Sequence, residues 1–296
     1  MQIIRYAGPS GVRAGVRDDD GTVRSLGVPS LASLLALPVE EIRAVLENTC
    51  PAEDGEVRLL PPVDGLTEVW AAGVTYQRSS SARQEESEVA DVYARVYDAE
   101  RPELFLKSPA WRVCGPGEPV GIRPDSSIDV PEPELAVVCN AAGQIVGATI
   151  CNDMSSRSIE GENPLYLPQA KIYDGACALG PGIVPAWELG DLQALDIAIT
   201  IRRAGELAWQ AAGSTAQLHR GLTELTGYLF RHASFPQGAV LSTGTGLVPG
   251  LDFTLAAGDE VAIEIAGLGR LVNVVRPATA EWFGWLTPEP GRLAPG

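Results

Sequence analysis

Residues 130–153 read VPEPELAVVCNAAGQIVGATICND, in which two apolar runs are joined by a turn. We expect the runs Leu135–Asn140 and Ile145–Asn152 to be β-strands, because each is short, apolar and rich in β-branched residues. The turn Ala141–Gln144, with Gly143 inside it, would join them as a hairpin. This hairpin predicts a buried β-core with acidic residues at one end.

Short strand-like segments, separated by Gly and Pro, lie on both sides of this hairpin. After residue 62 the further candidates are Glu68–Ala72, Leu104–Lys107, Pro119–Ile122, Leu195–Arg202, Glu206–Gln210, Ala239–Ser242, Glu260–Ile265 and Arg270–Val275. Helices are expected only near Ser81–Ala99 and Ser214–Arg231. Many short strands and few helices favour a mainly β or α+β fold, a mixed β-sandwich or barrel-like β-roll, over a doubly wound sheet.

The first 62 residues predict a small α+β domain of their own. Its strand-like pieces are Gln2–Tyr6, Gly11–Val16 and Thr22–Leu26. An amphipathic helix is expected over about Ser30–Asn48, and Pro38 should break or kink it. The pair Pro61-Pro62 is the best candidate boundary. We therefore expect an N-terminal domain at residues 1–62 and a catalytic domain at residues 63–296.

Composition limits the possible functions. The chain has 296 residues and a formal net charge of −16, which argues against binding nucleic acid or an anionic membrane surface. A small anionic ligand remains compatible with this charge, because a site can hold a local cation. The N-terminal segment shows no signal peptide, so we expect a cytoplasmic protein. The five cysteines lack paired-ligand spacing and should be reduced, mostly packed thiols.

Three carboxylates are expected to meet at one end of the hairpin. Glu132 and Glu134 lie two residues apart at the start of a strand, so both side chains point to one face. Asp153 follows the neighbouring strand and falls at the same edge. Like charges repel unless a cation lies between them, and Mg²⁺ prefers such oxygen ligands. The alternatives are a solvated acidic edge for the Glu pair and a turn or helix N-cap for Asp153.

Two lysines stand out, because Lys107 and Lys171 are the only lysines among 22 basic residues. Arginine does not give up its proton at ordinary pH, whereas a buried lysine can, since desolvation lowers its pKa. Lys171 is therefore a candidate for proton transfer, and chance survival of two lysines is the alternative. Glu160 and Glu162 flank Gly161 in an expected loop, where they would be polar groups of a lid or simply be solvated.

In combination, these motifs resemble the fumarylacetoacetate hydrolase family over roughly residues 64–275. The matching motifs are VPEPELAVV from Val130, Asn152-Asp153-Met-Ser-Ser-Arg, Lys171 and Thr243-Gly244-Thr245. The resemblance implies the β fold of the family's C-terminal domain and Mg²⁺ on the three carboxylates, with Mn²⁺ or Ca²⁺ as substitutes. It also implies a 2-keto acid substrate that meets Gly244 and Thr245, and a homodimer or homotetramer.

One departure from the family pattern affects the expected reaction. Family hydrolases carry GxNYxxH, whose histidine activates water, but residues 73–79 here read GVTYQRS, with Ser79 in place of the histidine. No histidine precedes His219, so hydrolysis should lack its base. The surrounding sequence resembles the family's sugar-acid branch, typified by 2-keto-3-deoxy-pentonate (arabinonate or xylonate) dehydratases.

This branch implies dehydration of a 2-keto-3-deoxy sugar acid to 2,5-dioxopentanoate through a metal-held enolate. Lys171 or Glu103 would remove the C3 proton, and the other would act as the acid that assists loss of the C4 hydroxyl. Further substrate contacts are expected from Arg78, Ser79, Lys107 and Tyr173. Three alternatives stay open: a hydrolase, decarboxylase or isomerase acting on another 2-oxo acid such as an acylpyruvate, a Schiff-base route through Lys171, and a protein whose acidic cluster is only structural.

Overall fold

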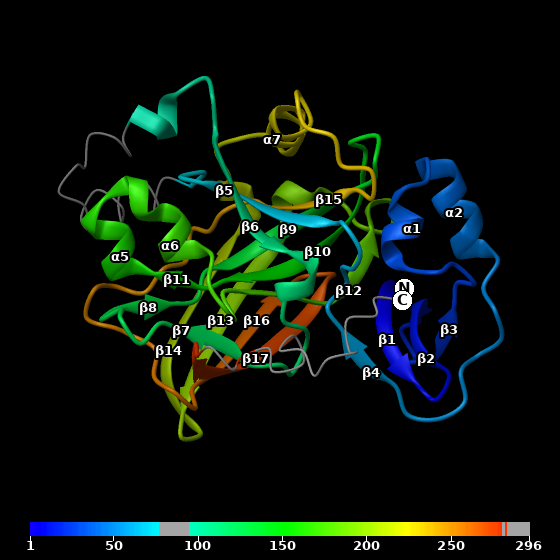
Figure 1. The fold of residues 1–296 in the computed structure, drawn as a ribbon, viewed down its shortest axis with the longest axis horizontal. Coiled ribbons are helices and arrows are strands. Elements are labelled where there is room, and N and C mark those ends of the chain that lie inside the picture. The colour runs from blue at the N-terminus through cyan, green and yellow to red at the C-terminus, as the bar shows by residue number, and fades with distance from the viewer. Residues whose placement is uncertain (77–94, 280–281, 283–296) are drawn as a thin grey trace, which may run out of the picture.

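The structure is a computed structural model that describes residues 1–76, 95–279 and 282 (Figure 1). The large sheet has the order β3-β2-β1-β12-β10-β9-β15-β5-β6, with β4 paired to β1. Its strands are β1 (Gln2–Gly8), β2 (Gly11–Arg17), β3 (Val23–Ser25), β4 (Arg58–Leu60), β5 (Glu68–Gly73), β6 (Glu103–Pro109), β9 (Pro133–Cys139), β10 (Ile145–Asp153), β12 (Cys177–Pro185) and β15 (Ala239–Ser242).

A second sheet of order β14-β13-β16-β17-β7 packs against the large one, and β8 pairs with β11 in a short ribbon. These strands are β7 (Val120–Ile122), β8 (Asp129–Val130), β11 (Ser155–Ser156), β13 (Asp196–Arg203), β14 (Glu206–Ser214), β16 (Glu260–Ile265) and β17 (Gly269–Pro277). The helices are α1 (Leu31–Leu35), α2 (Val39–Glu47), α5 (Arg157–Glu162), α6 (Leu167–Lys171) and α7 (Leu222–Leu229). Among the described residues, no helix combines the length and apolar character needed to cross a membrane.

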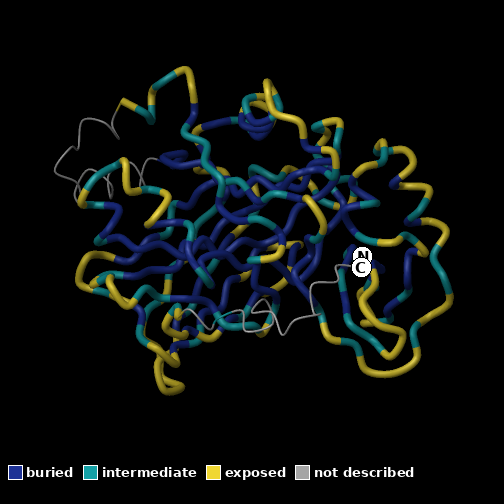
Figure 2. The backbone as a smooth tube through the Cα atoms, in the orientation of Figure 1, coloured by how far each residue is buried: buried dark blue, intermediate teal, exposed yellow. Residues whose placement is uncertain are grey.

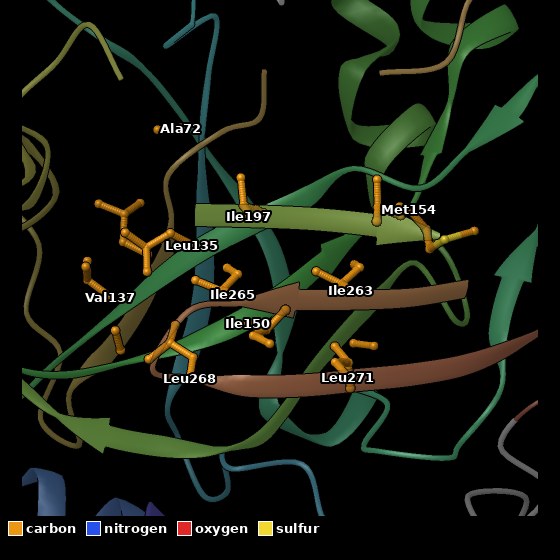
Figure 3. Packing of buried hydrophobic residues seen from close by; sticks show 14 of the residues in the cluster. Ala72, Leu135, Val137, Ile150, Met154, Ile197, Ile263, Ile265, Leu268 and Leu271 are labelled. Atoms are coloured by element: carbon orange, nitrogen blue, oxygen red, sulfur yellow. The ribbon is translucent and has the colours of Figure 1, made fainter. Parts of the chain in front are cut away.

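The main core lies between the two sheets. Leu135 and Ile150, from β9 and β10, face Ile263 of the second sheet, and all three are fully buried (Figure 3). Figure 2 shows that the buried backbone is concentrated where these sheets overlap. Strand β9 is buried at every residue, which explains its apolar run Leu135–Cys139. The mainly β, mixed-sheet fold predicted from the strand pattern is confirmed.

The hairpin β9–β10 also forms as predicted. Asn140 holds its turn, since Oδ1 accepts hydrogen bonds from Ala142 N at 3.1 Å and Gln144 N at 2.9 Å. Gly143 has φ 76, a left-handed conformation that glycine adopts without strain. At the other end, the backbones of Glu132 and Asp153 exchange two hydrogen bonds of 3.2 and 3.0 Å. This register fixes the acidic residues of both strands at one edge of the sheet.

The N-terminal segment extends the large sheet, since Ile3 of β1 pairs with Ile183 of β12. Pro38 separates α1 from α2, as predicted, and Leu34 and Ile42 of these helices are buried. Their side chains share a second apolar cluster with Val138 of β9, on the opposite face of the sheet from the main core. The division into domains at residue 62 stays a prediction.

Three segments differ from expectation. Strand β12 was not predicted, because Gly180-Pro181 resembles a turn, yet its nine residues are all buried. The helix expected over Ser214–Arg231 is only α7, since β14 continues to Ser214 and a turn follows it. The expected loop around Glu160 contains α5 and α6, which are too short for intrinsic propensity to identify. Of the helix expected near Ser81–Ala99, residues 81–94 lie outside the described part, and residues 95–98 are helical.

The packing between the sheets predicts a matched pair of stability effects. Val137 on β9 is fully buried in the main core, whereas Val274 on β17 is 40% exposed. Val137→Ala should lower the free energy of unfolding by about 2 kcal/mol or more, because it removes buried methyl groups and leaves a cavity. Val274→Ala should change it by less than about 0.5 kcal/mol. Urea unfolding followed by circular dichroism measures both, and equal effects would contradict the assigned core.

Candidate active site

Three carboxylates converge where the two central strands β9 and β10 of the large sheet begin and end. Glu132, Glu134 and Asp153 each place one oxygen within 4.8 Å of the others, and each residue is at most 4% exposed. Glu132 immediately precedes β9, Glu134 is its second residue, and Asp153 is the last residue of β10. The predicted convergence is therefore confirmed. Such a cluster of buried like charges requires compensating cations.

Lys107 supplies the first of these cations, from the far edge of the sheet. Val69 pairs with Ser108 and Trp70 with Leu106, so Lys107 is the extra residue of a β-bulge, a feature that redirects a side chain. Its Nζ lies 2.5 Å from Asp153 Oδ1 and donates hydrogen bonds to Met154 O at 2.9 Å and to Lys171 O at 2.6 Å. This ammonium therefore makes two hydrogen bonds and one close ion pair within the protein.

The Lys107–Asp153 contact also shows that the large sheet is curled. Strands β9, β15 and β5 lie between β6 and β10 in the sheet order. In a flat sheet, four strand spacings would place the two strands roughly 19 Å apart, which a lysine side chain cannot bridge. The sheet must therefore curve until β6 approaches the end of β10. The site lies on the inner side of this curve.

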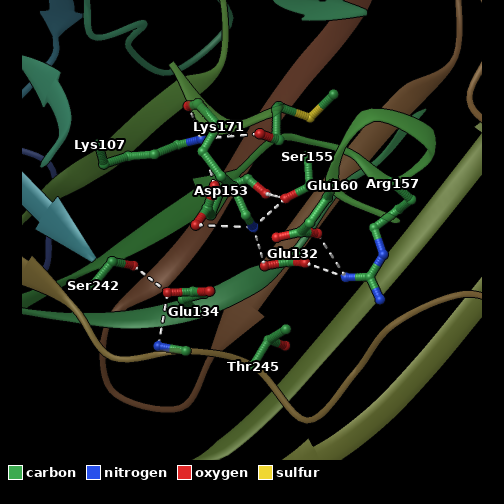
Figure 4. A network of polar contacts seen from close by, with 12 residues as sticks. Lys107, Glu132, Glu134, Asp153, Ser155, Arg157, Glu160, Lys171, Ser242 and Thr245 are labelled. Atoms are coloured by element: carbon green, nitrogen blue, oxygen red, sulfur yellow. Dashed lines mark hydrogen bonds and ion pairs between the residues drawn. The ribbon is translucent and has the colours of Figure 1, made fainter. Parts of the chain in front are cut away.

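Lys171 supplies the second cation, at the centre of the cluster (Figure 4). It is the last residue of α6 and is 1% exposed. Its Nζ donates to Glu132 Oε2 at 2.7 Å and to the hydroxyl of Ser155, and it lies 3.4 Å from Asp153 Oδ2. The lysine predicted from composition thus contacts two of the three predicted carboxylates.

Arg157 supplies the third cation, from the first turn of α5. Its Nη1 lies 2.8 Å from Glu132 Oε1 and 3.6 Å from Glu160 Oε2. The arginine, Glu132 and Glu160 side chains are all at most 5% exposed. Since Lys171 contacts one oxygen of Glu132 and Arg157 the other, two cations fix the orientation of this carboxylate.

Hydrogen bonds from the end of β15 orient Glu134. Ser242 Oγ donates to Glu134 Oε2 at 2.6 Å, and Gly244 N donates to the same oxygen at 2.8 Å. Burial, together with the charges of Asp153 and Glu132, nevertheless raises the pKa of Glu134 to about 8. Without a further cation, Glu134 therefore holds a proton at neutral pH.

The donor set fits a divalent metal ion. Three carboxylates that approach one another within 4.8 Å offer the oxygen ligands that Mg²⁺ prefers, and a cation among them would offset the burial and the like charges that raise the pKa of Glu134. The residues that would hold the ion are Glu132, Glu134 and Asp153.

The other predicted site residues lie at the same edge or outside the described residues. Glu103, the first residue of β6, pairs with Gly73, and a Cβ on Gly73 would lie 1.9 Å from Glu103 Oε2. The glycine is therefore needed for the carboxylate to lie across β5. Thr245 is 4% exposed and follows Gly244. Arg78 and Ser79 lie outside the described part of the chain.

Tyr173 lies close to the cluster but is largely buried, at 8% exposure. Burial raises the pKa of its phenol, and the charges of Asp129 and Asp153 add to this effect. The Arg123 guanidinium lies 5.6 Å from the centre of its ring. The roles of Tyr173, Glu103, Thr245 and Lys107 toward substrate stay predictions.

Sequence reasoning missed three polar residues of the site: Ser155, Arg157 and Ser242. Ser155 and Arg157 lie within the Asn152–Arg157 motif, and Ser242 immediately precedes Thr243. Each is at most 3% exposed, which is uncommon for a polar side chain. The sequence signal that could have found them is their position next to motif residues. The alternation of side chains along a strand does not show which of these neighbours point toward the carboxylates.

Among the described residues, no histidine takes the place of the histidine that serves as base in the family hydrolases. His219 N donates to Thr75 O at 2.9 Å, so this residue lies nearer to the site than its sequence position suggests. Its side chain, however, is exposed and stacks on Tyr97 with ring centres 4.4 Å apart. In the described part of the chain, the polar side chains whose contacts build the cluster are carboxylates, lysines, an arginine and hydroxyl groups.

The curled sheet and the buried carboxylate–lysine cluster define an enzyme-like protein with a divalent-metal site. Residues 68–276 match the family model described as the C-terminal domain of fumarylacetoacetate hydrolase. The chain therefore belongs to the fumarylacetoacetate hydrolase family.

Among its relatives, a probable 2-keto-3-deoxyxylonate dehydratase of Haloferax volcanii is 46% identical, over 86% of this chain and 89% of the relative. A 2-dehydro-3-deoxy-D-arabinonate dehydratase of Saccharolobus solfataricus is 41% identical, over 75% of each chain. A solved 2-keto-3-deoxy-D-arabinonate dehydratase, complexed with magnesium and 2,5-dioxopentanoate, superposes with a TM-score of 0.82 at 35% identity, covering 94% of this chain and 99% of that chain.

The raised pKa of Glu134 predicts how metal binding depends on pH. Glu134 must lose its proton before it can bind a cation, and its pKa is raised to about 8. Mg²⁺ affinity should therefore fall below about pH 8, by up to about tenfold per pH unit, and level off above it, with about one proton released per ion bound near pH 7. Calorimetry in buffers of different ionisation enthalpy measures both quantities.

Glu134→Gln is the control for this pH dependence. It should bind Mg²⁺ much more weakly, and without the step near pH 8, because no proton leaves residue 134. Equal Mg²⁺ affinity of the unaltered protein at pH 6 and pH 8 would contradict a protonated Glu134.

Proposed function

We propose that this protein is a magnesium-dependent dehydratase that converts a 2-keto-3-deoxy-pentonate, such as the D-arabinonate or xylonate form, to 2,5-dioxopentanoate. The observation that carries the proposal is Lys171 Nζ, which lies 2.7 Å from Glu132 and 3.4 Å from Asp153 in a buried cluster. Relatives named as pentonate dehydratases, 46% and 41% identical, support the same reaction.

The metal and the chain contribute different parts of the chemistry. When bound by the three carboxylates, Mg²⁺ would polarise the 2-keto group and make the C3 protons more acidic. Lys171 contacts two of these carboxylates and is held by Ser155, so its amine lies beside the place where the keto acid would bind. As a neutral amine it can remove the C3 proton.

Glu103 is the second proton-transfer group of the proposal. In its protonated form it would give a proton to the departing C4 hydroxyl, so that C3–H and C4–OH leave together as water. Transfer of one C5 proton to C3 then gives the C5 enol, and transfer of the enol hydroxyl proton to C4 gives the C5 aldehyde. In the alternative assignment, Glu103 is the base and Lys171 is the acid. Both assignments are possible because both residues are proton-transfer groups at the same end of the sheet's strands.

Hydrolysis of a C–C bond is the competing function within the family. It needs a base that activates water, and family hydrolases use a histidine where this chain has Ser79. Decarboxylation or isomerisation of another 2-oxo acid would need the same metal and lysine. The cytoplasm as location, and a homodimer or homotetramer as assembly, stay predictions.

A substrate panel tests the proposed function. Purified protein with Mg²⁺ should release 2,5-dioxopentanoate from 2-keto-3-deoxy-pentonates, measured as aldehyde formation, and excess EDTA should abolish the activity because the carboxylates lose their cation. Acylpyruvates and fumarylacetoacetate should give negligible hydrolysis. Efficient turnover of either would favour the hydrolase reading, and full activity in EDTA would disprove the metal-dependent mechanism.

Lys171→Arg separates charge from proton transfer. Arginine keeps the positive charge beside Glu132 and Asp153 but cannot act as a base at ordinary pH. We expect kcat to fall about 100-fold or more, while Mg²⁺ affinity measured by calorimetry changes much less. A near-normal rate would remove Lys171 from the chemistry. Borohydride with substrate should leave no adduct on Lys171 by mass spectrometry, since trapping one would indicate a Schiff base.

A further inference from the structure

Thr75 is a buried hydroxyl residue that the proposed mechanism does not use. It lies two residues after the end of β5 and is fully buried. Its Oγ1 donates a hydrogen bond of 2.6 Å to Thr243 O, in the segment that follows β15. This contact joins the two segments beyond the last pairing of their strands, that of Ala71 with Ser242. Thr75 therefore contacts the segment that orients Glu134.

The acceptor for Thr75 and a donor to Glu134 belong to one peptide unit. The carbonyl of Thr243 and the N–H of Gly244 share the planar group between these two residues, and in a trans peptide they point in opposite directions. The carbonyl accepts from Thr75 at 2.6 Å, and the N–H donates to Glu134 Oε2 at 2.8 Å. Fixing one side of a rigid plane fixes the other side, and a hydrogen bond to the carbonyl also polarises the N–H. The Thr75 hydroxyl therefore holds the N–H in place for Glu134.

Gly244 gives this peptide a freedom that has to be restricted. Its φ is 89, and a Cβ on it would overlap Thr75 Oγ1, so a residue with a side chain does not fit here. The permissive backbone of glycine also lets the preceding peptide rotate more easily. Without the Thr75 hydroxyl, such a rotation would carry the N–H away from Glu134 and leave its carboxylate with one donor fewer.

The backbone before Thr75 is held in an unfavourable conformation. Val74 has φ 52, a left-handed value that is a genuine outlier for a β-branched residue. Such conformations persist only where the surrounding contacts determine them, and they cluster at functional sites. Here the contacts include those of Thr75, whose own carbonyl accepts from His219 N at 2.9 Å. The turn after β5 thus brings the Thr75 hydroxyl to Thr243 despite a local conformational cost.

Resting on the metal site of the proposed function, we propose that Thr75 is a positioning residue. Its hydroxyl holds the peptide between Thr243 and Gly244 so that Glu134 keeps the direction in which it can bind Mg²⁺. Thr75 acts through this peptide and need not touch the ion or the substrate. Groups that orient the ligands of a metal typically change metal affinity by about 10- to 100-fold when they are removed.

Serine and alanine at position 75 isolate the hydroxyl, because they differ by that group alone. Thr75→Ser keeps the hydrogen bond, so its Mg²⁺ affinity should stay close to that of the unaltered protein. Thr75→Ala loses the bond, so its affinity should fall by about tenfold or more. Calorimetry with magnesium chloride and the full-length protein measures both. Thr75→Val repeats the deletion with the volume filled, should Thr75→Ala fail to fold.

Thr149 provides the matched control. It is fully buried on β10, and its Oγ1 donates at 3.2 Å to Gly180 O. Thr149→Ala therefore also removes one buried hydrogen bond to a backbone carbonyl. Both alanine variants should unfold at lower urea concentration than the unaltered protein, whereas only Thr75→Ala should lose Mg²⁺ affinity. A merely structural role of Thr75 would make the two variants behave alike.

The Gly244 amide reports on the peptide directly, in protein without metal. Only the glycines at positions 227, 244 and 246 follow a threonine, so combined labelling with ¹³C-carbonyl threonine and ¹⁵N-glycine selects their amides in an NMR spectrum. Hydrogen exchange at Gly244 should be at least about tenfold faster in Thr75→Ala than in Thr75→Ser, because the N–H is released from Glu134. Exchange at Gly227, in α7, should not change.

The outcomes separate this role from the proposed function. The role of Thr75 is overturned by equal Mg²⁺ affinities of Thr75→Ser and Thr75→Ala, or by an equal loss of affinity in Thr149→Ala. Weaker binding in Thr75→Ala with unchanged exchange at Gly244 would overturn it as well. If the protein fails to convert 2-keto-3-deoxy-pentonates while the expected affinities and exchange rates hold, the dehydratase proposal fails and the role of Thr75 stands.

Discussion

Repulsion among three buried carboxylates is the constraint on which the arrangement of this molecule depends. Glu132, Glu134 and Asp153 are brought together by the register of one hairpin, and none can avoid the others without breaking the strand pairing. The compensating charges come from elsewhere in the fold. A bulge in β6 directs Lys107 inward, and the short helices α5 and α6 carry Arg157 and Lys171 to the same place. Each of these irregular elements has a role in balancing charge.

The two lysines are retained in an arginine-rich chain for different physical reasons. The single ammonium nitrogen of Lys107 contacts Asp153 and two backbone carbonyls. The planar guanidinium of an arginine cannot reproduce this arrangement around one nitrogen. Lys171 contacts the carboxylates themselves, where the ability to lose a proton distinguishes lysine from arginine. The two lysines are therefore kept for two different reasons, and only Lys171 is proposed to be catalytic.

The sequence alone predicted the hairpin and its acidic edge, because alternation and strand length determine which side chains share a face. It also predicted the break at Pro38, since proline removes a backbone donor. It did not predict β12, whose Gly180-Pro181 pair imitates a turn, or helices α5 and α6, which exist through tertiary contacts. Arg157 and Ser242 were missed because their direction depends on those elements. The approach of Lys107 to Asp153 depends on the curvature of a whole sheet, which no local pattern encodes.

The pairing of β5 with β15 has a consequence for how the chain reaches its native state. These strands run parallel, with Glu68 beside Ala239, so the large sheet closes only after most of the chain has been synthesised. Contacts of such long sequence separation are formed slowly, because the entropy of closing a long loop is lost before the contacts stabilise it. The residues that orient Glu134 belong to β15 and the segment after it. Glu134 can therefore be oriented only late in folding, and a nascent chain carries its acidic hairpin without that support.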